Sequence, residues 1–220
     1  MKKETVFNHE VVRCKCEDES LYRSDILLND LNRVFDLPRF ADAVYNIKDW
    51  NGPDTAPPGT YGSSMYTDDN SWSLNELCGI EPFLSWFKEQ ALKSAEYFGF
   101  DNATDVVLTR TWSNKYLYGS SARIHSHKEG VPPPESEQLD IVSVFYVQQP
   151  DDPSSADFVL VKDGRDGDVV EDQPIENISF MNVKQGDLLF HRAYNTWHGV
   201  SLHKHKTPRI MFILEFYFKK

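Results

Sequence analysis

The chain has 220 residues, of which 34 are acidic and 23 basic, so its formal net charge is -11. This length suits one domain, and an acidic balance without any Lys/Arg-rich block argues against nucleic acid as a partner. No apolar run is long enough to span a membrane and the N-terminus lacks the apolar core of a signal peptide, so we expect no membrane partner and a cytoplasmic location.

The first half of the chain predicts one strand and two helices. Residues 6–16 alternate weakly between polar and apolar side chains, which indicates a strand. Apolar residues at helical spacing predict an amphipathic helix over residues 21–40. A second helix is predicted over residues 81–99, and its apolar face is typical of a helix packed on a sheet. Residues 52–59 are rich in Pro and Gly and predict a loop between the helices.

From residue 105 onward the sequence changes to short strands separated by turns. We expect strands in the segments 106–112, 123–127, 139–147, 158–161, 178–183, 187–190 and 209–218, and a proline-rich loop over 128–138. Six or seven short strands without intervening helices favour an antiparallel sandwich or barrel. We therefore expect one domain, in which residues 1–104 supply a strand and helices that pack on a barrel formed by residues 105–220.

Three histidines in this second half have the spacing of a metal site. His125 and His127 lie at positions i and i+2, where strand side chains share a face, and His198 must come from another strand or its turn. Three neutral ring nitrogens with open coordination positions suit a divalent transition metal such as iron, zinc, copper or nickel. The other histidines fit ordinary surface or core roles; they are His9, His191, His203 and His205.

Arg209 follows His198 by eleven residues and lies in the apolar segment 208–217. A permanently charged guanidinium is costly to bury without an acidic partner. A bound carboxylate ligand would supply that partner. The sequence therefore predicts a metal site with an anion-binding arginine beside it.

A series of short motifs runs through residues 106–218. The motifs are Trp112-x-Asn114 with Tyr118-Gly119, His125-x-His127, Ser143-Val-Phe-Tyr-Val147, the segment 183–190, Trp197-His198-Gly199-Val200 and Arg209-Ile210. In this succession the chain resembles the 2-oxoglutarate- and Fe(II)-dependent oxygenases, and it is most similar to the small bacterial and phage branch with a His-x-His motif. The resemblance implies a double-stranded β-helix, or jelly roll, with a prolyl-hydroxylase-like and cupin-like arrangement. It also implies that His125, His127 and His198 bind Fe(II), and that Arg209 pairs with the far carboxylate of 2-oxoglutarate.

The chain departs from this family at one metal ligand. His127 stands where most members have an acid, so the matching side chain is neutral. His127 with Glu129 and His198 is an alternative ligand set, which restores a carboxylate and leaves His125 outside the metal's ligands. The strand register before the proline loop favours His125 over Glu129.

A second departure lies beside the arginine. Many relatives have Arg-x-Ser where this chain has Arg209-Ile-Met211, so the hydroxyl is lost. Another group must then complete the cosubstrate site, and the candidates are Tyr116 and Tyr118.

The resemblance implies hydroxylation of a small molecule or peptide by O2 and 2-oxoglutarate, with release of succinate and CO2. Two other functions remain open from the residues alone. One is a cupin-like three-histidine dioxygenase that works without 2-oxoglutarate and uses Arg209 to bind its substrate's carboxylate. The other is a non-catalytic barrel that keeps the metal. The strand-forming C-terminal residues 216–220 could pair two chains into a homodimer through a sheet edge.

Overall fold

The structure is a computed structural model that describes residues 1–36, 60–63, 73–127, 140–164 and 167–220. The loops expected over residues 52–59 and 128–138 lie outside these ranges. None of the helices in the described ranges is both long enough and apolar enough to cross a membrane.

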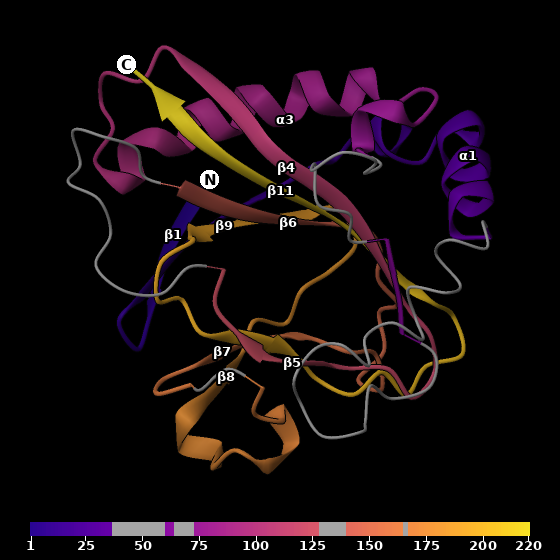
Figure 1. Cartoon of the computed structure of the whole chain (residues 1–220), viewed down its shortest axis with the longest axis vertical. Coiled ribbons are helices and arrows are strands. Elements are labelled where there is room, and N and C mark those ends of the chain that lie inside the picture. The colour runs from indigo at the N-terminus through magenta and orange to yellow at the C-terminus, as the bar shows by residue number, and fades with distance from the viewer. Residues whose placement is uncertain (37–59, 64–72, 128–139, 165–166) are drawn as a thin grey trace.

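Two helices cover one face of the larger sheet (Figure 1). Helix α1 spans Asp25–Phe35 and follows a short 3-10 turn, η1, at Glu19–Leu21. The helix predicted over residues 21–40 therefore begins four residues later than expected, because the Ser24 side chain accepts a hydrogen bond from the Leu27 amide (3.3 Å) and caps it there. Its predicted end falls outside the described residues.

The second predicted helix is confirmed. Helix α3 spans Glu81–Ser94 and continues as the 3-10 turn η4 over Ala95–Phe98. It ends where Gly99 adopts the left-handed conformation, with φ of 86°. Further 3-10 helices lie at η3 (Leu74–Glu76), η5 (Val170–Asp172) and η6 (Ile175–Asn177).

The strands form two antiparallel sheets. The larger sheet has the order β1-β2-β9-β6-β11-β4-β3, and the smaller sheet has the order β5-β10-β7-β8. The larger sheet contains β1 (Lys2–Val6), β2 (His9–Lys15), β9 (Asp187–Arg192), β6 (Asp140–Gln148), β11 (Arg209–Lys219), β4 (Asp105–Tyr116) and β3 (Thr60–Ser63). The smaller sheet contains β5 (Ala122–His125), β10 (His198–Val200), β7 (Phe158–Val161) and β8 (Ile178–Phe180).

From β4 onward the chain passes back and forth between the two sheets. Strands β4, β6, β9 and β11 lie in the larger sheet, and β5, β7, β8 and β10 lie in the smaller one. This alternation, with antiparallel pairing throughout, is the double-stranded β-helix, so the predicted jelly roll is confirmed.

Two strand predictions needed correction. The single strand expected over residues 6–16 is a hairpin of β1 and β2, which turns at Phe7 with φ of 56°. The described residues of the barrel half form eight strands rather than six or seven. The missing strand was β10, whose three residues are too few to show an alternating pattern.

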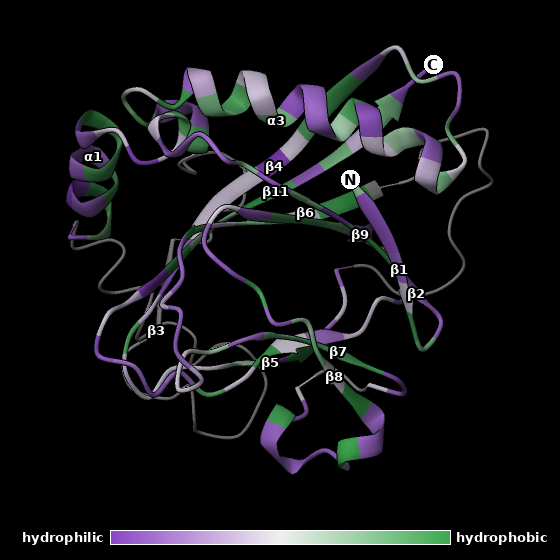
Figure 2. Cartoon of the chain, turned by 180° about the vertical axis from the view of Figure 1, so that it is seen from behind, coloured by the Kyte–Doolittle hydropathy of each residue, from purple (hydrophilic) through white to green (hydrophobic). Residues whose placement is uncertain are grey.

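The core has two main layers, and the alternation of β11 separates them. Ile210, Phe212 and Leu214 face the helices, whereas Met211 and Ile213 face the smaller sheet. Figure 2 shows that the central strands of the larger sheet are mainly hydrophobic, while α1 and α3 alternate between hydrophobic and hydrophilic residues. The odd-numbered residues of β11, Arg209 among them, therefore point into the space between the sheets.

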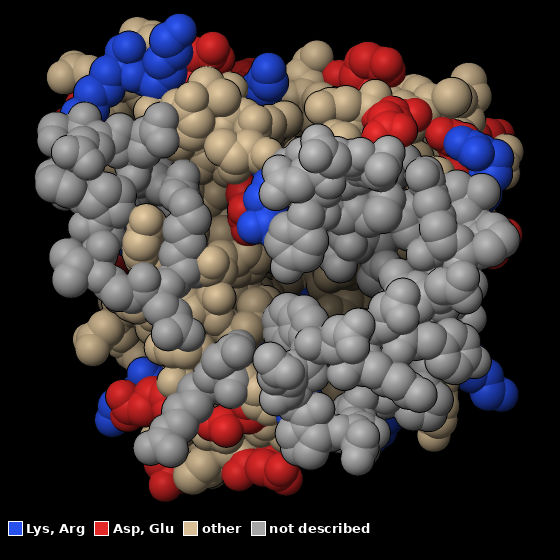
Figure 3. Space-filling model, viewed as in Figure 1, with Lys and Arg blue, Asp and Glu red and all other residues tan. Residues whose placement is uncertain are grey.

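The C-terminal strand is not a sheet edge. Strand β11 pairs with β4 on one side and with β6 on the other. The edge pairing expected of residues 216–220 is therefore not open to Phe216 and Tyr217, because each already pairs with a neighbouring strand on both sides. On the face drawn in Figure 3, acidic and basic side chains of the described residues are interspersed around the margin.

Candidate metal centre

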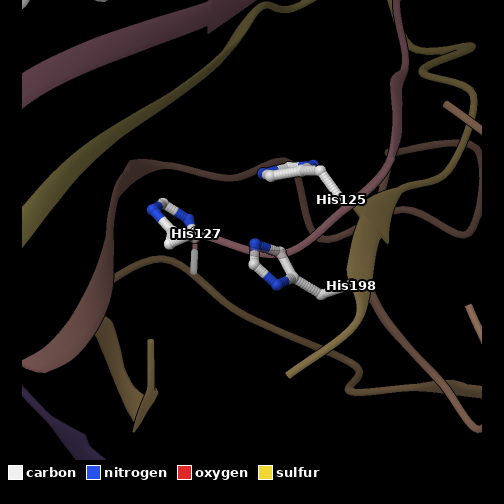
Figure 4. A group of neighbouring side chains, drawn as sticks. All are labelled: His125, His127 and His198. Carbon is white, nitrogen blue, oxygen red and sulfur yellow. The ribbon is translucent and has the colours of Figure 1, made fainter. Parts of the chain in front are cut away.

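The structure brings together the three histidines that the sequence singles out. His125 ends β5 and His198 begins β10, and these two residues are direct partners in the antiparallel ladder. His127 follows two residues after His125, in the segment just beyond the strand. One ring nitrogen from each histidine lies within 4.8 Å of the other two, and the three rings converge (Figure 4).

Packing on the far side of β5 and β10 holds these histidines in place. Ile124 points away from the metal centre into a cluster with Val159 and Val161. Gly199, beside His198, has no room for a side chain: a Cβ there would lie 2.6 Å from Val170 Cγ2 and 3.1 Å from the Ala122 carbonyl oxygen. The close approach of η5 to β10 therefore requires glycine after the ligand histidine.

Each of the three rings makes a hydrogen bond through Nδ1. The acceptors are the Arg123 carbonyl for His125 (2.8 Å), the Thr196 carbonyl for His198 (2.9 Å) and the Glu215 carboxylate for His127 (2.5 Å). A carbonyl or carboxylate oxygen only accepts, so Nδ1 carries the proton and Nε2 keeps its lone pair. All three rings are thus set in the tautomer that offers Nε2 to a metal ion.

Burial keeps two of these rings neutral. Burial, together with the neighbouring His127, lowers the pKa of His125 to about 4. Burial also places the pKa of His198, which is 3% exposed, well below its ordinary value, with His125 adding to the effect. Neutral imidazole is the form that binds a divalent metal, so His125 and His198 need lose no proton at neutral pH.

A fourth histidine lies beside this cluster. His191 on β9 is fully buried, and its ring centre lies 4.8 Å from that of His198 and 6.1 Å from that of His127. Burial lowers its pKa to about 3. Among the described residues nothing hydrogen-bonds to its Nε2. Sequence reasoning treats His191 as an ordinary core histidine and gives no hint of this position.

These buried histidines predict that the metal-free protein loses stability in mild acid. The pKa values of these three histidines in the folded state lie below the ordinary 6.5. The stability that they contribute is therefore fully present above pH 6.5 and is lost as pH falls toward about 4. At pH 5 His125 and His191 each cost roughly 2 kcal/mol, and His198 adds a loss of the same sign, because the unfolded chain binds protons that the folded chain does not. Urea denaturation of the metal-free protein at pH 7.5 and pH 5 measures this loss. His191→Leu should reduce the loss by roughly 2 kcal/mol, and equal stability at both pH values would contradict the account.

A second polar group lies between the sheets. Arg209 is 0% exposed, and no described residue makes a well-formed hydrogen bond to its Nε, Nη1 or Nη2. Its guanidinium carbon lies 5.0 Å from the ring centre of Tyr146 and 5.6 Å from that of Tyr116. Aromatic faces stabilise a cation only in part, and within the described ranges this buried charge has no acidic partner of the kind that burial requires.

The two tyrosines predicted to complete this site lie in different places. Tyr116, the ladder partner of Arg209, is 3% exposed and sits beside it. Tyr118 is 67% exposed. Tyr146 on β6 was missed, although its hydroxyl is buried with no hydrogen-bond partner among the described residues. Burial raises its pKa far above the ordinary value, although Arg209 opposes this, so the hydroxyl remains a donor. The alternative ligand Glu129 lies outside the described residues.

Known structures share this fold. No family model matches the chain, and no curated protein is similar to it in sequence. HygX from Streptomyces hygroscopicus, crystallised with nickel, 2-oxoglutarate and hygromycin B bound, aligns over 94% of this chain and 82% of its own, with TM-score 0.56 and 10% identity. AviO1 from Streptomyces viridochromogenes Tue57 aligns over 94% of this chain and 89% of its own, with TM-score 0.55 and 12% identity. At these identities the likeness establishes a common fold.

Proposed function

We propose that this chain is a 2-oxoglutarate- and Fe(II)-dependent oxygenase that hydroxylates a small molecule or a peptide side chain. The observation that carries the proposal is the buried guanidinium of Arg209, which has no acidic partner among the described residues and faces the same inter-sheet space as three histidines with free Nε2 atoms. A dicarboxylate cosubstrate is the kind of ligand that needs both features.

The histidines fit a catalytic iron site. Three neutral nitrogen donors suit Fe(II), and three protein ligands leave coordination positions for other molecules. Bound Fe(II) would let O2 and 2-oxoglutarate react to succinate and CO2, with the second oxygen atom passing into a C–H bond of the substrate. The fold of HygX, which was crystallised with nickel and 2-oxoglutarate, supports the same arrangement.

Arg209, Tyr146 and Tyr116 would hold the far carboxylate of 2-oxoglutarate. The guanidinium offers paired donors that match a carboxylate, and the Tyr146 hydroxyl is a further unused donor beside it. Tyr116 packs on the guanidinium from the neighbouring strand. Tyr146 would thus replace the hydroxyl that the family has two residues after the arginine.

Tyr146→Phe should raise the half-saturating concentration of 2-oxoglutarate by about 10-fold, since one hydrogen bond to a charged group is lost. Iron affinity should not change. Because no described residue hydrogen-bonds to the hydroxyl, unfolding by urea should show no loss of stability. Tyr22→Phe is the matched control, since Tyr22 is equally buried but lies in the layer under the helices. An unchanged 2-oxoglutarate requirement in Tyr146→Phe would remove this residue from the site.

The proposed activity is tested by incubating the protein with Fe(II), O2 and 2-oxoglutarate and measuring succinate. Many such reactions turn over slowly without substrate, so a candidate library of small molecules and peptides is added and scored by the increase in succinate. Succinate that requires Fe(II) and O2 together supports the proposal. A protein that binds iron but yields no succinate under any of these conditions would contradict it.

A cupin-like three-histidine dioxygenase is the second candidate. The observation in its favour is that all three described ligands are neutral histidines. In that enzyme Arg209 would bind the carboxylate of the substrate itself, and O2 uptake would not depend on 2-oxoglutarate. A homodimer, a cytoplasmic location and the identity of the substrate stay predictions from the sequence.

A further inference from the structure

Glu215 is a buried carboxylate in contact with the candidate metal centre. It lies on β11, and its side chain is 7% exposed. One carboxylate oxygen lies 2.5 Å from Nδ1 of His127, and the other lies 3.4 Å from a terminal nitrogen of Arg110. Its two oxygens thus have two separate partners, which fixes the orientation of the group.

The three histidines differ in what lies behind them. Behind His125 and His198 the acceptor is a backbone carbonyl, which carries only a partial charge. Behind His127 it is a carboxylate, with a full negative charge. A hydrogen bond from Nδ1 to a carboxylate makes Nε2 a stronger donor to a metal than the same bond to a carbonyl.

This difference matters because a bound metal ion would bring positive charge into the site. A divalent ion bound by three neutral rings brings two positive charges into a buried region, and buried charge is costly unless it is compensated. Among the described residues, Glu215 is the carboxylate that contacts a ligand of the candidate site. Arg110 contacts the carboxylate oxygen of Glu215 that His127 does not use, so it is placed to hold the carboxylate.

We infer that Glu215 is a positioning residue for the metal centre: it orients His127 and supplies, through the ring, the negative charge that the three ligands themselves lack. This inference rests on the metal site of the proposed function. The Glu215 carboxylate contacts the His127 ring and not the ion itself, so it strengthens metal binding without occupying a coordination position. The site can then keep as many positions open as a site with a carboxylate ligand.

The test compares Glu215→Gln with wild type in anaerobic titrations with Co(II), followed by the visible absorption of the bound ion. Glutamine keeps the size of the side chain and its contact with His127 but removes the charge. Loss of a supporting carboxylate of this kind weakens metal binding by about 10- to 100-fold, and the Co(II) absorption bands should shift because His127 becomes a weaker donor. Equal affinity and unchanged bands would overturn the inference.

Asp187→Asn is the matched control. Asp187 is also a carboxylate on the larger sheet, 6% exposed and bound to a backbone amide, but it lies at the other end of β9 from His191. If Glu215 were merely structural, both variants would lower the melting temperature and neither would alter Co(II) binding. If wild type itself fails to bind Co(II), the proposed function fails as well; if wild type binds and Glu215→Gln binds equally well, only this inference fails.

A measurement on wild type covers the case in which Glu215→Gln does not fold. The Zn(II)-loaded protein, labelled with nitrogen-15 at histidine, should show one Nδ1 proton resonance shifted far downfield of the other two and slow to exchange with water. Such a shift is expected of a short hydrogen bond to a carboxylate, which is also buried here. Three equivalent Nδ1 resonances would overturn the inference.

Discussion

Replacing His198 with alanine is expected to weaken Fe(II) binding by about 100- to 1000-fold, since a metal site of few ligands loses several kcal/mol with each one. His198 has the largest expected effect because its ring is close to both other ligands: its centre lies 4.4 Å from that of His125 and 5.2 Å from that of His127. Oxygenase activity should fall below detection at iron concentrations that saturate wild type. An anaerobic Fe(II) titration measures the affinity.

His203→Gln is the control for this prediction. His203 is also fully buried in the smaller-sheet half of the molecule, but both of its ring nitrogens are used: Nδ1 accepts from the Ala156 amide and Nε2 donates to the Thr207 carbonyl. Its loss should lower stability and leave iron affinity unchanged. Iron affinity that stays at the wild-type value in His198→Ala would exclude the three-histidine site.

The second large effect is expected at Arg209. Arg209→Leu should raise the half-saturating concentration of 2-oxoglutarate by about 100-fold or more, because a paired, charge-assisted interaction in a buried site is lost. Fe(II) binding should stay close to wild type, since the guanidinium is not among the ligands. Arg209→Lys should be intermediate, because it keeps the charge but not the paired donors. Isothermal titration with 2-oxoglutarate and Fe(II) under anaerobic conditions measures both affinities.

Arg209→Leu should also make the ligand-free protein more stable. In the ligand-free state the guanidinium is a buried charge without an acidic partner among the described residues, and removing such a charge gains about 2 kcal/mol or more. Saturating 2-oxoglutarate should then raise the melting temperature of wild type and not that of the variant. A variant that is less stable than wild type and still binds 2-oxoglutarate would show that Arg209 serves the fold.

Much of the fold follows from local patterns in the chain. The helical spacing of residues 81–99 and the short strands after residue 105 were enough to predict helices packed on an antiparallel sandwich or barrel, and the resemblance to the oxygenases implied that it is a jelly roll. Strand β10 was missed because three residues are too few to show an alternating pattern. The β1–β2 hairpin was read as one strand because its turn, Phe7-Asn8, has Phe rather than Gly or Asn at the position with positive φ.

Some residues of the candidate site could be predicted from the sequence and others could not. His125, His127 and His198 were readable because two share an i, i+2 spacing and the third belongs to a motif. Glu215 and Tyr146 were not, since each meets its partner across strands far apart in sequence; His127 and Glu215 are separated by 88 residues. The alternation of side chains along β11 could have indicated Glu215. Like Arg209, Met211 and Ile213 it has an odd number, so it lies on the inner face of the strand.

The most direct test of the central claim is an anaerobic optical titration. Fe(II) and then 2-oxoglutarate are added to the metal-free protein, and the visible spectrum is recorded. We expect a weak charge-transfer band, as arises when a keto acid chelates histidine-bound Fe(II), and we expect Arg209→Leu to lack it at the same 2-oxoglutarate concentration. Bound iron without this band in wild type would contradict the account and favour the dioxygenase that works without 2-oxoglutarate.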